Sequence, residues 1–286
     1  MAGDFGRQGT GGPDLRPGDV LGRAFGLLTG NAGAYAFIVM FFTLLERILL
    51  GIFGTDEAQI SALLYGDGLP EGAGPGTLFA LWPAGLVFLV CYCIQQGAFS
   101  ALALDQMAGR PADFAESMLK AGLRAGPLCL VGLAYFAGIL GFVMLTLLPV
   151  AFGKGLLILC IPAALLLSAV YSATFFVVYP VTIDDYAGVA ATFRKSAGLT
   201  RGQRMKVFGI YLAGSTVALL MLVLTGSGLS AIALAAGSSG VINYFADLAV
   251  SLIGGLAVAW LCCISAVVYA DLRSAGGNRQ DPAIFD

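Results

Sequence analysis

Histidine is absent from the 286 residues, and charged residues make up only 11% of the chain, against about 25% in soluble domains. Without histidine, no Ser–His or Cys–His nucleophile pair can form. The sequence also contains no Gly-Lys-Ser or Gly-Lys-Thr phosphate loop and no zinc-ligand spacing. These absences argue against the common hydrolase, nucleotide-binding and zinc-enzyme classes, and nothing in the sequence supports nucleic-acid binding. We therefore expect no enzymatic activity and no cofactor.

Apolar residues make up 58% of the chain and gather in six long segments. A hydrocarbon core about 30 Å thick needs about 20 apolar residues per helix. The segments are 34–53, 78–102, 128–152, 156–178, 208–235 and 248–269. Since a backbone in lipid must satisfy its own hydrogen bonds, they predict an all-α, polytopic membrane protein with six transmembrane helices.

The basic residues lie almost entirely on one side of these segments. They are Arg7, Arg16, Arg23, Arg110, Lys120, Arg124, Arg194, Lys195, Arg201, Arg204, Lys206, Arg273 and Arg279. Across the connections on the other side, Lys154 is the one basic residue, and the first of these connections carries Asp56, Glu57, Asp67 and Glu71. By the positive-inside rule, we expect an even number of spans with both termini in the cytoplasm.

This pattern predicts one six-helix transmembrane domain over residues 19–272, with disordered cytoplasmic tails at 1–18 and 273–286. The first apolar segment is too long for the apolar region of a cleavable signal peptide. We therefore expect the first helix itself to direct insertion, and we expect no soluble catalytic domain.

Three polar connections have the pattern of amphipathic helices that lie flat on a membrane surface. Asp113, with Glu116 three residues later, is a variant of the capping box and opens a helix whose polar face includes Lys120. The stretch from Asp19, which we expect to cap its helix, repeats this design, and so does the stretch after residues 184–186. We therefore predict three interfacial helices.

Each predicted surface helix is followed by two spans, which indicates a threefold internal repeat of surface helix plus hairpin. The best internal match sets residues 24–31 beside 196–203. Its matching positions are Gly26 and Gly198, Leu27 and Leu199, Gly30 and Gly202, and Asn31 and Gln203. The match supports the first and third units directly.

Glu46 and Arg47 are adjacent charges in the outer half of the first span. A charge at mid-helix costs about 2.5–3.5 kcal/mol on insertion scales, and neighbours in sequence point about 100° apart, so the two cannot fully neutralise each other. We expect Arg47 to pair with Asp247. Alternatively, a helix that starts near Leu27 would bring Glu46 to the outer interface, where its side chain could reach water. A transport or proton-handling role for Glu46 is the third interpretation.

Polar and small residues inside the other spans are expected to serve packing. Gln95 and Gln96 predict hydrogen bonds across helices, worth about 1–2 kcal/mol each, rather than a substrate site. The pairs Ala134 with Gly138 and Ala137 with Gly141 match small-residue helix contacts.

Six cysteines fall inside the apolar segments. The neighbours Cys91 and Cys93, and Cys262 and Cys263, have no carboxylate close by in sequence and do not share a helix face. We interpret them as small apolar packing residues and expect no metal site.

A basic run precedes the fifth span and consists of Arg194, Lys195, Arg201, Arg204 and Lys206. Charges that determine topology account for such a run. The alternative is contact with anionic lipid headgroups, worth up to about 1 kcal/mol per charge, or with a protein partner. Membrane lipids are thus the expected partners, and a protein partner stays open.

Part of this region resembles a known family. The residues are Tyr179-Pro180 through Asp184, then Phe193-Arg194-Lys195-Ser196, Leu199-Thr200-Arg201-Gly202 and Arg204. They resemble the membrane domain attached to some bacterial glycerophosphoryl diester phosphodiesterases, and its stand-alone relatives, over about residues 90–270. The resemblance implies a multi-pass module of the bacterial cytoplasmic (inner) membrane without catalytic residues of its own. Phosphodiesterase activity does not carry over, because it belongs to a separate soluble domain.

We therefore expect a non-enzymatic integral membrane module in lipid or envelope homeostasis. The alternatives are a small transporter that uses Glu46 and a scaffold subunit of a membrane complex.

Overall fold

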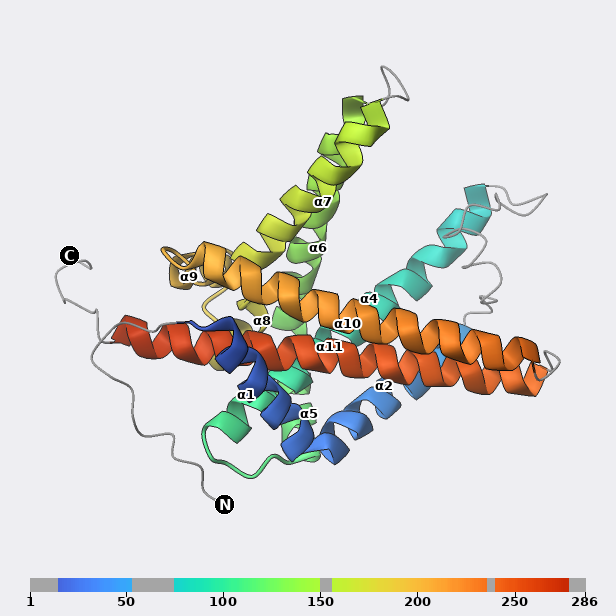
Figure 1. Ribbon diagram of the computed structural model, residues 1–286, viewed down its shortest axis with the longest axis horizontal. Coiled ribbons are helices and arrows are strands. Elements are labelled where there is room, and N and C mark those ends of the chain that lie inside the picture. Colours follow the sequence, from blue (N-terminus) through green and yellow to red (C-terminus); the bar gives the residue numbers. More distant parts are fainter. Residues whose placement is uncertain (1–14, 53–74, 150–155, 236–239, 278–286) are drawn as a thin grey trace.

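The computed structural model describes residues 15–52, 75–149, 156–235 and 240–277 (Figure 1). The helices are α1 (Pro17–Gly30), α2 (Ala32–Ile52), α4 (Pro75–Met107), α5 (Phe114–Leu123), α6 (Ala125–Leu147), α7 (Leu157–Thr174), α8 (Val178–Asp184), α9 (Val189–Leu199), α10 (Arg204–Ala235) and α11 (Gly240–Gly277). Six stretches of these helices are long and apolar enough to cross a membrane. They are Ala32–Leu49, Gly85–Met107, Ala125–Thr146, Ile158–Asp184, Arg204–Ile232 and Tyr244–Ala275. The prediction of an all-α, polytopic membrane protein is confirmed.

The helices form three units of the same order. Unit one is α1, α2 and α4; unit two is α5, α6 and the broken pair α7–α8; unit three is α9, α10 and α11. Each unit opens with a short helix and continues as a hairpin of two long helices, and the three hairpins run in different directions in Figure 1. The predicted internal repeat is therefore present in the fold.

The units pack in a closed cycle. The short helix of each unit lies on both spans of the unit before it: α5 on α2 and α4, α9 on α6 and α8, and α1 on α10 and α11. The first spans follow the same rule, since α6 packs on α4, α10 on α7, and α2 on α11. Unit one therefore contacts unit three in the same way as unit two contacts unit one and unit three contacts unit two. The three units form a closed ring.

The second spans of units one and three, together with the α8 part of the second span of unit two, occupy the centre. Helices α4, α8 and α11 pack against one another, whereas α2, α6 and α10 lie outside them. Burial is densest where these three helices meet near the short helices, at residues such as Phe99, Leu102, Val177, Ile264 and Tyr269. We call this end of the molecule the base.

The fourth span breaks between α7 and α8, and the break has a covalent cause. Pro180 has no N–H to donate to the carbonyl of Phe176, four residues earlier. The freed Phe176 oxygen instead accepts a hydrogen bond of 2.6 Å from the Ser265 hydroxyl of α11. The Thr174 carbonyl at the end of α7 accepts from Ser196 of α9 at 3.4 Å and from Thr200, which follows α9, at 3.3 Å. Neighbouring helices therefore satisfy the carbonyls that the break exposes.

Some predicted boundaries differ from the structure. Arg16 occupies the N-cap position of α1 and Pro17 opens the helix, so Asp19 lies in the first turn and is not the cap. Asp113 does cap α5 as predicted, because its carboxylate accepts from the Ala115 N–H at 3.0 Å. Helix α11 continues to Gly277, beyond the expected start of the C-terminal tail.

Candidate functional site

The three short helices present the same face to the bundle. In each of the segments 20–24, 117–121 and 192–196, the five successive side chains are buried, half-buried, exposed, half-buried and buried. The closing residues Ala24, Ala121 and Ser196 are completely buried, and their small side chains let the helix backbone approach the spans. This register extends the match between residues 24–31 and 196–203 to unit two.

The fourth position of each segment is a cation, and each cation pairs with an acid on the preceding unit. Arg23 of α1 contacts Asp271 of α11 through its two terminal guanidinium nitrogens, with one contact at 3.0 Å. Lys120 of α5 contacts Asp105 near the end of α4 at 2.7 Å. Lys195 of α9 contacts Asp185, which directly follows α8. We call these the three equivalent ion pairs; each one ties a short helix to the second span of the unit before it.

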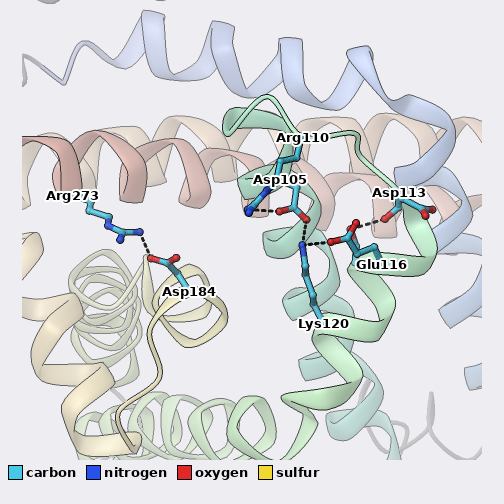
Figure 2. Close-up of polar contacts among 8 residues, drawn as sticks. Asp105, Arg110, Asp113, Glu116, Lys120, Asp184 and Arg273 are labelled. Carbon is cyan, nitrogen blue, oxygen red and sulfur yellow. Dashed lines mark hydrogen bonds and ion pairs between the residues drawn. The ribbon is translucent and has the colours of Figure 1, made fainter.

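Asp105 is the most buried acid of the three. Its carboxylate lies between Arg110 and Lys120, and Lys120 also contacts Glu116 one turn earlier on α5 at 2.8 Å (Figure 2). Partial burial lowers the pKa of Lys120, but hydrogen bonds to Asp105 and Glu116 outweigh this effect and leave the pKa raised. Two cations compensate the desolvation of one buried carboxylate here.

The adjacent acids Asp184 and Asp185 connect α8 to two different neighbours. Asp184 accepts a hydrogen bond from the Tyr269 hydroxyl of α11 at 2.5 Å. It also pairs with Arg273 of α11 (Figure 2). Asp185 pairs with Lys195 of α9, and this hydrogen bond lowers the pKa of Asp185. One dipeptide therefore joins the ends of units two and three.

The polarity of the α5 helix is opposite to the simple expectation that charged residues face water. The cations Lys120 and Arg124 of the α5 region point into the base, where the Arg124 guanidinium donates to the Thr182 carbonyl at 2.5 Å. Leu119 and Leu123 point away from the protein and are 62% and 78% exposed. Exposed leucines beside the ends of membrane spans are suited to contact with lipid.

The predicted basic run divides into two groups. Lys195 is held in its ion pair and is half-buried. Arg194, Arg201, Arg204 and Lys206 are exposed around the α9–α10 connection. Arg194, Arg201 and Arg204 form no ion pair with another described residue. We call these three arginines the unit-three arginines.

The charges of the first span lie apart from the base. Helix α2 begins at Ala32, so Glu46 lies about 21 Å along it at 1.5 Å per residue, in the half of the helix farther from the base. The alternative start near Leu27 is wrong, because Leu27 belongs to α1. Glu46 is half-buried, and Arg47 lies over the ring of Tyr244 on α11 at 5.1 Å. The side chain of Asp247 is outside the described residues, so its pairing with Arg47 stays a prediction.

The amides and small residues pack as expected in several places. Gln95 and Gln96 are buried, and Gln96 accepts a hydrogen bond from Cys262 of α11 at 2.6 Å. Gly138 packs against Tyr171 of α7, whereas Gly141 has open space around it. The described part of the chain contains no group of three or more Cys, Asp and Glu residues placed to hold a metal ion.

Two central residues of the base were missed at the level of sequence. Asp105 and Asp271 each lie near the end of a span, on the same side as the basic residues. The positive-inside rule counts Lys and Arg and gives no weight to acids, so it passes over them. The sequence feature that could have revealed them is an acidic residue at the end of the second span of each unit.

Comparison with protein-family models, curated proteins and solved structures finds no match to this chain. The arrangement of the base therefore carries the functional argument.

Proposed function

We propose that this chain is a non-enzymatic module of the bacterial cytoplasmic membrane, with both termini in the cytoplasm, and that it acts in lipid or envelope homeostasis. The observation that carries the proposal is the closed cycle of three surface helices, each tied to the preceding unit by one of the three equivalent ion pairs. This arrangement holds three amphipathic helices at one end of six membrane spans, where they can contact lipid headgroups.

The outward faces of these helices support a lipid partner. Phe25 on α1 is 58% exposed, and Leu119 and Leu123 on α5 are 62% and 78% exposed. Met205, the second residue of α10, is 80% exposed. Apolar residues at an interface enter the boundary between headgroups and acyl chains, while neighbouring cations attract anionic lipids. The resemblance to the membrane domain of glycerophosphoryl diester phosphodiesterases supports the same setting.

The dense packing of the base favours a binding or organising module over a conduit. Tyr35, Phe99, Leu102, Leu128 and Val177 are each completely buried there. A conduit through this end would need these side chains to separate, at a cost in buried apolar surface.

The test is purification in native lipid nanodiscs, followed by mass spectrometry of the lipids and proteins that stay bound. The proposal expects enrichment of particular phospholipids over the bulk membrane, and a change in phospholipid composition when the chain is deleted from its host. Bulk lipid composition in the discs, together with an unchanged membrane in the deletion strain, would refute it. Recovery of one stoichiometric protein instead would favour a scaffold subunit.

Glu46 is the observation that favours a transporter as second candidate, because a half-buried carboxylate in the outer half of a span is costly to keep without a role. Solute uptake that depends on a pH gradient and is lost in Glu46→Gln would support it. A Glu46→Gln protein with full activity would remove it.

A further inference from the structure

The internal repeat provides a comparison within one chain. Units one and two build the same base as unit three, so a residue that only unit three carries is not needed to form it. The first spans confirm the register, because each buries a pair three residues apart near its start. These pairs are Tyr35 and Ile38, Leu128 and Val131, and Val207 and Ile210, all completely buried.

The unit-three arginines have no charged counterparts in this register. Arg194 occupies the exposed third position of its five-residue segment, where units one and two have Gly22 and Leu119. Arg204 lies three residues before the buried pair, where the other units have Ala32 and Ala125.

Arg201 is the third of these arginines and lies six residues before the buried pair of unit three. Unit one has Thr29 at this place. The three arginines are therefore additions to a base that forms without them.

A hydrogen-bonded turn holds Arg201 and Arg204 in place. The Arg201 N–H donates to Gly198 and the Gln203 N–H to Thr200, at 3.1 and 3.0 Å. Gly202 has a φ of +84°, which L side chains rarely adopt, and this lets α9 end and α10 begin within a few residues. The Thr200 hydroxyl donates a hydrogen bond to the Thr174 carbonyl, which connects the turn to the end of α7. The guanidinium groups are thus presented from a fixed backbone.

We propose that Arg194, Arg201 and Arg204 form a binding surface for the phosphate groups of anionic phospholipids in the cytoplasmic leaflet. The inference rests on the proposed function, since it requires the base to face the cytoplasmic headgroups, and it names the lipid class.

Two observations favour lipid over a soluble anion. Arg201 and Arg204 lie where α10 enters its apolar stretch, because Arg204 is the first residue of that span and completely buried Val207 follows one turn later. Met205, between Arg204 and Lys206, is 80% exposed, which suits insertion beside an acyl chain. Guanidinium groups also bind phosphate oxygens in a bidentate manner.

The test uses the full chain in nanodiscs of mixed phosphatidylcholine and phosphatidylglycerol, with native mass spectrometry of the lipids retained on the protein. The variant is Arg194→Gln with Arg201→Thr, the latter being the residue of unit one. The matched control is Arg110→Gln with Arg273→Gln, which removes the same charge from arginines that acids of the base already engage.

Each cation near an anionic surface contributes up to about fivefold in affinity. We expect the unit-three variant to lose at least fivefold in retention of phosphatidylglycerol relative to phosphatidylcholine, and the control to keep most of it. Equal retention in variant and wild type, or an equal loss in the control, would overturn the proposal. Thermal unfolding of both variants checks that the base still forms.

The proposed function can fail separately. One outcome is that the unit-three variant loses phosphatidylglycerol while the phospholipid composition of the deletion strain is unchanged. That result would support the lipid-binding surface and refute the role in lipid or envelope homeostasis. If a nucleic acid or protein co-purifies through these arginines and phosphatidylglycerol does not, the surface is assigned to the wrong partner.

Discussion

Arg23 and Asp271 are 248 positions apart in sequence, and their side chains form an ion pair between α1 and α11. The pair closes the cycle of three units, because it joins the first surface helix to the last span. Lys120 with Asp105 and Lys195 with Asp185 make the same connection between consecutive units.

Exchange of charge across the Arg23–Asp271 pair tests this closure. Arg23→Asp alone places two acids together and should lower the free energy of unfolding by about 1 kcal/mol, a modest value because Arg23 is partly exposed. The double variant Arg23→Asp with Asp271→Arg should recover at least half of the loss. Thermal unfolding in detergent, followed by tryptophan fluorescence, measures both. A double variant less stable than either single variant would mean that the pair does not form.

Asp105 should contribute more to the stability of the folded protein than Asp185 or Asp271, because it is buried and pairs with two cations. Asp105→Asn should lower the free energy of unfolding by about 2 kcal/mol, since the change removes the charge of a buried carboxylate that engages two partly exposed cations. Asp113→Asn is the matched control, because asparagine caps a helix as well as aspartate does. Equal effects of the two substitutions in the same unfolding assay would argue against a special role for Asp105.

Two glycines one turn apart on α6 should respond oppositely to alanine. A Cβ on Gly138 would lie 2.2 Å from the Tyr171 hydroxyl oxygen, and Tyr135, Phe142 and Phe175 surround that ring. Gly138→Ala should therefore cost about 1–3 kcal/mol. Gly141→Ala meets nothing and should be neutral or stabilising by up to about 1 kcal/mol through helix propensity. Melting temperatures that change in parallel would show that α6 and α7 do not pack as described.

The break in the fourth span predicts a compensating pair. Ser265→Ala leaves the Phe176 carbonyl without its donor and should cost about 1–2 kcal/mol. Adding Pro180→Ala restores a backbone N–H that can reach this carbonyl, so Ser265→Ala should cost less in that background. A double-mutant cycle on unfolding free energy measures the coupling, and purely additive effects would contradict the explanation.

The sequence was sufficient for the six spans and the three surface helices, because segment length and apolarity are local properties. It also indicated the relation between units one and three through the match at residues 24–31 and 196–203. The comparison did not reveal unit two, because the connection between its short helix and its buried pair, Leu128 and Val131, is one helical turn shorter than in the other units. An alignment without gaps therefore cannot match both parts of unit two at once.

The direction of the cations could not be read from local pattern. Arg23, Lys120 and Lys195 have the spacing of a solvated polar face, yet each pairs with an acid of the preceding unit. Their orientation depends on acids that tertiary packing brings near, and for Arg23 that acid is at the other end of the chain. Glu46 and Arg47 lie in the second half of α2, and this position along the helix depends only on where α2 begins.

The account depends most on a chain that crosses the membrane six times with its basic residues in the cytoplasm. The direct measurement is labelling of single cysteines with an impermeant maleimide in intact cells, after the six native cysteines have been replaced. Asp67→Cys should react at once, and Gly277→Cys only after the membrane is permeabilised. Reaction of both residues from the same side would contradict the account.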